Sequence, residues 1–426
     1  MSHSSDPKGD PVEVDGSRGA EPIQRRTVAL LSAAQMFTSV GTAAVVTVGP
    51  MLAAELAGDS LAGTPSTAQS LGATIAAALL ARFAISRGRR PALSTGITIA
   101  LSGALLVILA AVTEQFWLVV VGSGLAGFGG ASNLQARFAA TDLAKPAHRG
   151  RDLSLVVWLG TIGVVAGPNL VGVGESVATW LGLPVLSGIF VLSAASLLVA
   201  LILVFAGLRP DPLLLARERA GIAGASMHRP GLITGLRSIG RHPRALAGLI
   251  GVAAGHGLMV AVMGMTPVHM THHGATIVIV GIVVSLHMFA MYGVSPVWGL
   301  LADRVGGVAV VVLGLVTTLA SGVIAAFAGG DHVVTAVGLI LLGLGWGAST
   351  VAGAVLVVNG VPAEERVGAQ GASDTIMNLA GAVLGLASGW VLSAVGYEGL
   401  GISAAALAAI AAAAVILLTA RSHARG

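Results

Sequence analysis

Histidine and methionine side chains are concentrated in one stretch of the chain, between His256 and Met291. The chain has 11 histidines and 11 methionines, and half of all these side chains fall in this stretch. Thioether sulfur is a soft, neutral metal ligand and imidazole is an intermediate one. The chain contains no cysteine, so the set includes no thiolate, and no carboxylate lies within it. These residue types favour Cu(I) over zinc, magnesium or manganese.

The spacing of these residues predicts two groups. At about 100° per residue of a helix, His256, Met259 and Met263 share one face, and His287 precedes Met291 by one turn on the next helix. The predicted intramembrane binding residues are therefore Met259, Met263, His287, Met291 and His256. Between the two helices we expect an outer loop that captures the ion. The predicted capture residues are His269, Met270, His272 and His273.

A second interpretation of the same cluster requires no metal. Methionine is a flexible side chain that fills gaps at moving helix interfaces. A histidine inside a membrane protein serves equally as a proton relay or as a hydrogen-bonded core group. Taken one at a time, the residues of the cluster fit this packing interpretation better than a metal site.

The composition predicts that the elements carrying these residues lie in lipid. Of the 426 residues, 55% are hydrophobic and 10% are charged, with a mean hydropathy of +0.89, whereas a soluble domain has about 25% charged residues. Outside the polar N-terminus and a polar stretch at 208–243, about 360 residues remain, and at roughly 25–30 residues per spanning helix and its loop they predict an all-α membrane protein with twelve transmembrane helices. The polar stretch divides these helices into two six-helix bundles. The predicted spans are 27–54, 66–86, 91–113, 116–140, 152–173, 183–207, 245–267, 275–299, 306–328, 333–358, 367–394 and 396–420. The predicted parts are a disordered N-terminus (1–26), a first bundle (27–207), a linker (208–244), a second bundle (245–420) and a tail (421–426).

The positive charges predict the topology. All 23 lysines and arginines fall at the termini or in alternate loops, and the loops 82–90 and 137–151 include the last residues of the predicted spans before them. By the positive-inside rule, both termini and the linker are then cytoplasmic. Membrane orientation thus accounts for the basic balance, which gives no reason to expect a nucleic-acid partner. Arginine outnumbers lysine by 21 to 2, which together with abundant alanine and glycine indicates a GC-rich bacterial genome and hence a bacterial inner membrane.

The loop after the eighth predicted span carries a second motif. Residues 299–307 read GLLADRVGG, and they resemble the loop motif of the major facilitator superfamily. With the six-plus-six layout, the resemblance covers nearly the whole chain and implies alternating access. It also implies that Asp303 and Arg304 form a cytoplasmic latch. In the first half, Ile85 and Ser86 stand where the aspartate and arginine should be, so the resemblance does not extend a latch to that half.

A third motif lies in the fifth predicted span and consists of Gly163, Gly167, Pro168 and Gly172. Small residues four apart let a neighbouring helix approach closely, and proline bends the helix. The motif resembles the glycine-proline element of proton-coupled antiporters in the same superfamily. It fits a kinked packing helix equally well, so the direction of transport does not follow from it.

The methionine and histidine positions also carry a resemblance. Met259 and Met263, followed by His287 and Met291, resemble a paired motif of the copper importers in this superfamily that supply cytochrome oxidase assembly. The resemblance implies that these four residues handle copper. Members of the same transporter family carry riboflavin or solutes of unknown identity.

Asp374 is the acidic residue that lies clearly inside a predicted span. Carboxylates within a membrane are expensive and usually functional, which makes Asp374 the candidate for proton coupling. The alternative rests on Pro362, which is typical of the first turn of a helix. A helix that starts there begins in the cytoplasm and leaves Asp374 near the membrane interface.

Together these features predict a secondary active transporter and not an enzyme. The sequence has no phosphate-binding loop ending in Lys-Ser or Lys-Thr, no His-Glu-x-x-His zinc motif and no nucleophile elbow in a matching context. The leading predicted substrate is Cu(I), moved inward, and the alternative is proton-coupled efflux of small organic or drug-like molecules. The expected partners are the lipid bilayer and a small solute or metal ion. We expect copper only as a transported ion, a proton gradient as the driving force and no permanently bound cofactor. The oligomeric state does not follow from the sequence.

Overall fold

The computed structural model describes residues 20–145, 148–219, 232–362 and 365–423, and every regular element within them is a helix. Eleven helical runs in those residues are long and apolar enough to span a membrane. The last of them, α15 (Arg366–His423), contains two passes, because Gly396 has a φ of 70° and interrupts the helix between them. The predicted twelve-helix membrane fold is therefore confirmed.

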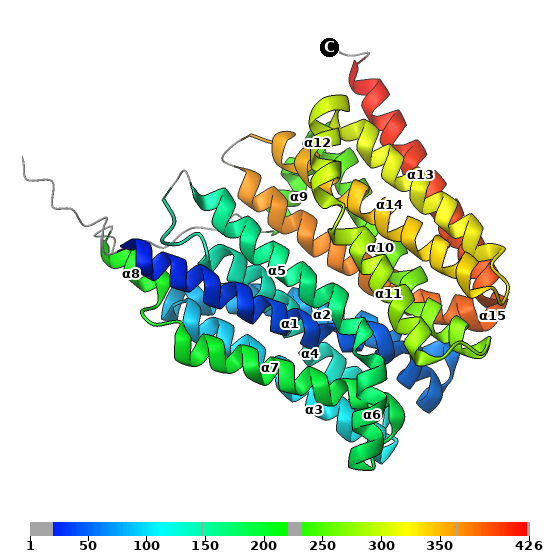
Figure 1. Ribbon diagram of the computed structural model, residues 1–426. Helices are drawn as coiled ribbons and strands as arrows, with labels where there is room; N and C mark the ends of the chain where they lie inside the picture. The colour runs from blue at the N-terminus through cyan, green and yellow to red at the C-terminus, as the bar shows by residue number, and fades with distance from the viewer. Residues whose placement is uncertain (1–19, 146–147, 220–231, 363–364, 424–426) are drawn as a thin grey trace, which may run out of the picture.

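The helices form two bundles that lie side by side (Figure 1). The first bundle consists of α1 (Ala20–Ala57), α2 (Thr64–Arg87), α3 (Arg89–Thr113), α4 (Phe116–Ala139), α5 (Arg149–Asn169), α6 (Val171–Leu181) and α7 (Gly188–Gly207), with the short turns η1 (Asp59–Leu61) and η3 (Val185–Ser187). The second consists of α10 (Pro243–His272), α11 (Ile277–Tyr292), α12 (Ser295–Val305), α13 (Gly307–Ala326), α14 (His332–Asn359) and α15.

Two of the twelve passes are each built from two helices. In the fifth pass, Pro168 precedes the end of α5 at Asn169, and α6 starts at Val171. In the eighth pass, α11 ends at Tyr292 and α12 starts at Ser295. A proline lies beside each break, and proline removes a backbone donor that a continuous helix needs.

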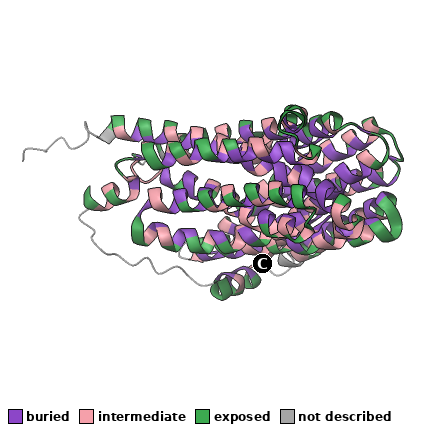
Figure 2. Ribbon diagram, turned by 90° about the horizontal axis from the view of Figure 1, so that it is seen from below, coloured by how far each residue is buried: buried purple, intermediate pink, exposed green. Residues whose placement is uncertain are grey.

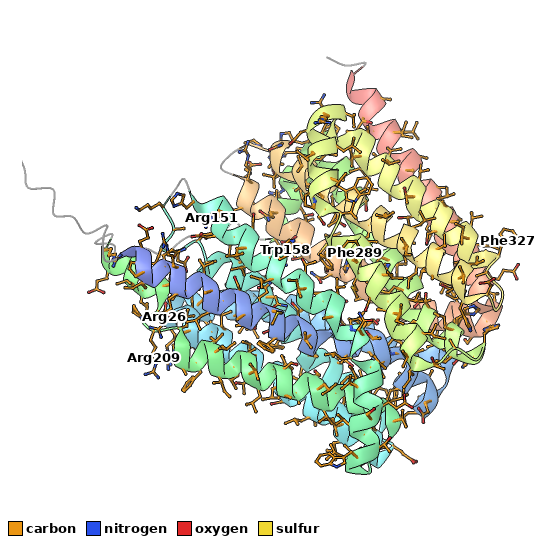
Figure 3. The ribbon with its side chains drawn as sticks, in the orientation of Figure 1. Arg26, Arg151, Trp158, Arg209, Phe289 and Phe327 are labelled. Carbon is orange, nitrogen blue, oxygen red and sulfur yellow. The ribbon has the colours of Figure 1, made fainter. Side chains whose placement is uncertain are left out.

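The positive charges of the described residues lie at one end of the molecule. Successive passes run in opposite directions, so each loop that contains arginine or lysine joins two passes at this same end. Arg26, Arg151 and Arg209 lie there (Figure 3). We call it the arginine end and the opposite end, where Phe327 lies in Figure 3, the far end. The sorting matches the alternation predicted from the sequence.

The outer faces of the bundles are apolar and the inner faces contain small residues. Large side chains such as Trp117, Trp180 and Phe327 are 72%, 83% and 79% exposed, as expected for surfaces that face lipid. Figure 2 shows the buried residues gathered between the helices. Helices approach closely at glycines, as where a Cβ on Gly72 would lie 1.9 Å from the carbonyl oxygen of Gly124.

Three boundary predictions are corrected. Residues 20–26, predicted to be disordered, begin α1, and the Gln24 amide donates to the Ala140 carbonyl and to Asp152 at 2.7 Å. Residues 1–19 lie outside the described residues. The linker, predicted as a loop, contains the helices α8 (Pro212–Arg219) and α9 (Leu232–Arg241). The seventh pass continues to His272, because its apolar core contacts extend through Met270.

Candidate functional site

A cavity of about 310 Å³ lies between the two bundles. Helices α1, α2, α4 and α5 line it from the first bundle, and α10, α11 and α15 line it from the second. A cavity of this size at the contact between two domains is the usual position of a small-molecule site. The cavity is therefore the candidate functional site.

The first bundle provides mostly polar side chains to the cavity. The Asn133 amide nitrogen donates to the Ser39 hydroxyl at 3.2 Å, and the Gln69 amide nitrogen donates to the Thr42 carbonyl at 3.4 Å. Gln35 is 2% exposed, and its Oε1 has no hydrogen-bond partner among the described residues. Amides that retain unused donors and acceptors are suited to an organic ligand with several polar atoms.

The second bundle provides sulfur, aromatic and imidazole groups. Of the five predicted binding residues, four line the cavity: Met259, Met263, Met291 and His256. His256 Nδ1 accepts a hydrogen bond from the indole nitrogen of Trp346 at 3.1 Å. Met288 and Tyr292 also line the cavity and were not predicted.

His287 is the predicted binding residue that the structure does not bring to the cavity. It is completely buried, and its Nδ1 donates to the Leu339 carbonyl at 2.6 Å, so the ring faces α14. Its Nε2 has no partner among the described residues. One face of α11 lines the cavity, because Met291 and Tyr292 follow Met288 by three and four residues, whereas His287 lies on the adjacent face.

The predicted outer capture loop is instead the last turn of α10, and its side chains separate. His269 stacks on Tyr397 with ring centres 4.1 Å apart and donates from Nε2 to the Gly329 carbonyl. Met270 is 1% exposed and packs in the core, so it is not available at the mouth. His272 lies 3.7 Å from Asp59 of the first bundle.

His273 is exposed, and its ring centre lies 4.3 Å from that of His269. The four predicted capture residues therefore do not form a single open site. In the described part of the chain, no group of three or more histidine, aspartate or glutamate side chains is arranged to hold a metal ion.

The fifth-pass motif packs at two interfaces. A Cβ on Gly163 would lie 2.2 Å from the Met36 carbonyl oxygen of α1, and a Cβ on Gly167 would lie 2.5 Å from the Ala43 methyl. At the break and beyond it, the motif meets the second bundle. The Pro168 carbonyl oxygen lies against Gly281 of α11, and Gly172 lies against Val278.

Asp303 and Arg304, the predicted latch residues, are both exposed in the last turn of α12. In the first half, where the resemblance provides no latch, the chain has a different ion pair. Arg89 binds Asp142 through two nitrogens, at 2.8 and 3.2 Å, and both side chains are largely buried. Burial raises the pKa of the Asp142 carboxyl, and the hydrogen bond and charge of Arg89 act in the opposite direction.

Arg137 is the cavity residue that the sequence interpretation assigned to a loop. It belongs to the last turn of α4 and lines the cavity one turn beyond Asn133. The charge of Asp374, on α15 of the second bundle, acts on it across the space between the bundles. The sequence contains a signal for this position: Asn133 and Arg137 are four residues apart in a largely apolar helix and therefore share one face of it.

Contacts between the two bundles are found toward the far end. The Thr67 hydroxyl of α2 donates to the Ala382 carbonyl of α15 at 2.8 Å. A Cβ on Gly63 would lie 1.9 Å from the Gly385 carbonyl oxygen. With the His272–Asp59 contact, these contacts close the space between the bundles on the far side of the cavity.

Comparisons with known proteins agree with this architecture. Residues 31–291 and 257–426 match the family model of the Major Facilitator Superfamily. The chain is 39% identical over 381 residues to YdeG of Bacillus subtilis, described as an uncharacterized MFS-type transporter, with 88% of this chain and 87% of the relative covered. It is 28% identical over 382 residues to the riboflavin transporter RfnT of Brucella anthropi, with 88% and 91% covered.

A solved structure shows the same fold. The nucleoside transporter NupG aligns with a TM-score of 0.68 and 17% identity, and the alignment covers 93% of this chain and 99% of NupG. The matched family model and the 39% identical relative cover nearly the whole chain. The chain therefore belongs to the Major Facilitator Superfamily and is a multi-pass membrane transporter of small solutes.

Proposed function

We propose that the protein transports a small organic solute that has both apolar and hydrogen-bonding groups. The observation that carries the proposal is the composition of the cavity, which is lined by the amides of Gln35, Gln69 and Asn133 from the first bundle and by the thioethers of Met259 and Met263 from the second. Such a surface offers several donors and acceptors and a broad apolar area, and these groups fix the orientation of an organic ligand. A metal ion would leave most of these polar groups without a role.

Riboflavin is the first solute to test. Its flat ring system is apolar on both faces and carries polar atoms around its edge, and its chain carries hydroxyl groups. The riboflavin transporter RfnT of Brucella anthropi is similar over most of both chains. This similarity supports the use of riboflavin as a probe. The proposal itself concerns the class of small organic solutes that have both apolar and hydrogen-bonding groups.

Cu(I) is the second candidate, and a specific observation favours it. Met259, Met263, Met291 and His256 line one cavity, and thioether and imidazole are ligands that Cu(I) accepts. The position of His287, turned toward α14, removes one member of the set implied by the copper importers. Copper therefore depends on the three methionines and on His256, whose Nδ1 already accepts a hydrogen bond from Trp346.

Transport in this proposal proceeds by alternating access. With the arginine end in the cytoplasm, as the positive-inside rule requires, the contacts at the far end close the outer side of the cavity. Rocking of the bundles then exchanges the closed side around a fixed site. Proteoliposomes with an imposed pH gradient distinguish proton-coupled efflux from uptake, because the sign of the gradient that drives accumulation differs between the two.

The first prediction concerns riboflavin. Replacing Asn133 with leucine removes an amide from the cavity at nearly constant volume, and loss of one buried hydrogen-bonding group weakens binding by roughly tenfold. Quenching of riboflavin fluorescence by the purified protein in nanodiscs measures the affinity. Asn359→Leu is the matched control, because Asn359 is exposed at the end of α14 and lies outside the cavity. Equal affinities in both variants and in the natural protein would remove the cavity as the binding site.

The second prediction concerns copper. If Cu(I) is the solute, Met259→Leu and Met291→Leu weaken Cu(I) binding measured by competition with a chromogenic chelator. Met265→Leu is the control, because Met265 is fully buried in the same helix as Met259 and does not line the cavity. For the organic-solute proposal we expect the three variants to be alike in this assay. A selective loss of Cu(I) binding in the two cavity variants would favour copper and contradict the primary proposal.

A further inference from the structure

The cavity contains one fixed positive charge. Arg137 is the single lysine or arginine among the described residues that line it. The residue is half-buried, and its Nε is shielded from solvent without a hydrogen-bond partner in the described part of the chain. A guanidinium has five donors and no acceptor. Its burial is costly unless those donors and the charge are satisfied.

Two ionisable groups face Arg137 from the second bundle, and neither is hydrogen-bonded to it among the described residues. The charge of Asp374 on α15 acts on it, and Tyr292 on α11 lines the cavity with it. Asp374 is exposed and is not one of the residues that line the cavity. The guanidinium is therefore near a counter-charge and still lacks a direct partner, as expected for a group that receives an anion from the solute.

The neighbours of Arg137 show how such a solute would lie. Asn133 lines the cavity one helical turn before Arg137, and Asn378 lines it from α15, where its side-chain nitrogen donates to the Asp374 carbonyl at 2.8 Å. The thioethers of Met259 and Met263 line the cavity from α10. The cavity thus has a charged and polar part and an apolar part.

We propose that the transported solute is an organic anion and that Arg137 binds its carboxylate or phosphate group. The inference rests on the proposed function, because it specifies the charge of the organic solute. The planar fork of a guanidinium matches two oxygens of either group, and such bidentate pairs are stronger than neutral hydrogen bonds. Asp374 is the internal anion that the solute displaces in its electrostatic contact with Arg137.

Two flavins that differ in one group provide the test. Riboflavin is neutral, and flavin mononucleotide is riboflavin with a phosphate added. In nanodiscs, we expect the natural protein to bind flavin mononucleotide more tightly than riboflavin. We expect Arg137→Gln to reduce the affinity ratio of the two flavins by about 10-fold to 100-fold, the effect of a hydrogen-bonded charge. Arg137→Lys retains part of the ratio, and Asp374→Asn increases it because the competing carboxylate is gone.

The control is Arg82→Gln, because Arg82 is exposed on α2 and lies outside the cavity. We expect Arg82→Gln to have the same ratio of flavin mononucleotide affinity to riboflavin affinity as the natural protein. Thermal unfolding midpoints show that each variant is folded. Riboflavin binding with no preference for flavin mononucleotide, or a preference that survives Arg137→Gln, would overturn the anion inference and leave the proposed function standing. If neither flavin binds, the same comparison is made between the affinities for salicylate, which is an anion, and for its uncharged amide. A preference for salicylate that Arg137→Gln removes supports the inference, and no preference overturns it.

Discussion

Replacing Gly63 with alanine is expected to open the far end of the transporter. Gly63 directly precedes α2 of the first bundle, and a Cβ there would lie 1.9 Å from the carbonyl oxygen of Gly385 in α15 of the second. Backbone atoms cannot turn away as a flexible side chain can, so the overlap is relieved by separation of the bundles. Overpacking of this kind costs about 1–3 kcal/mol. A bias of that size shifts the ratio of two states by about 5-fold to 150-fold.

Two alanine variants separate this effect from general destabilisation. A Cβ on Gly72 would lie 1.9 Å from the carbonyl oxygen of Gly124, but both residues belong to the first bundle. Gly72→Ala therefore strains every state in which that bundle is folded and does not favour one of them. Gly371→Ala adds its methyl group to open space, since no atom lies within 4 Å of the added carbon.

The absence of cysteine makes the measurement direct, because any introduced pair can be spin-labelled alone. Trp180 of the first bundle and the far-end residue Phe327 of the second are 83% and 79% exposed, and cysteines at these positions report the separation of the bundles. We expect a longer distance population in Gly63→Ala than in Gly72→Ala or Gly371→Ala. Identical distance distributions in all three variants would show that the Gly63–Gly385 contact does not control the closed state.

This contact shows where prediction from sequence ends. Hydropathy and the sorting of positive charge predict the twelve helices and their alternating direction, because a bilayer acts on each segment separately. The proximity of Gly63 and Gly385 arises from the docking of two bundles. Nothing local in either segment specifies the partner.

The candidate site, too, can be predicted from the sequence only in part. Spacing identifies a helical face, and Met259 and Met263, which it places on one face, both line the cavity. Spacing does not specify what that face contacts, and His287 turned out to face α14 although Met291, one turn later, lines the cavity. The sequence does not identify Arg137 as a cavity residue, because the positive-inside rule predicts arginines at cytoplasmic loops and therefore already explains one at the end of α4.

Replacing Arg89 with alanine is expected to produce the largest loss of stability. The Arg89 side chain is 13% exposed and that of Asp142 is 12% exposed. The Arg89 guanidinium also donates to the Gln135 side-chain oxygen at 2.8 Å. The substitution leaves a carboxylate buried without its cation. Removing one partner of a buried pair costs about 3–5 kcal/mol of unfolding free energy, which denaturant titration in detergent measures.

Two comparisons make this result specific. Arg25→Ala removes an ion pair with Glu21 of similar length, 2.7 Å, whose side chains are 79% and 51% exposed. Exposed pairs of this kind contribute about 0.3–0.5 kcal/mol. The double variant Arg89→Ala/Asp142→Ala should recover part of the loss, because it removes the stranded carboxylate too. A double variant as unstable as the sum of the two single variants would contradict the assigned role of the pair.

The loss of unfolding free energy in Arg89→Ala should also depend on pH, and the Asp142 carboxyl determines whether the loss grows or shrinks as the pH rises. Burial already raises its pKa in the folded protein, and removing Arg89 takes away the group that opposes this shift. A carboxyl with a raised folded-state pKa binds its proton more tightly in the folded than in the unfolded chain, so its effect on stability becomes unfavourable as pH rises through the folded-state pKa. The deficit of Arg89→Ala relative to the natural protein is therefore expected to be largest at neutral pH and to shrink in acid, whereas Arg89→Ala/Asp142→Ala should show no such pH-dependent deficit.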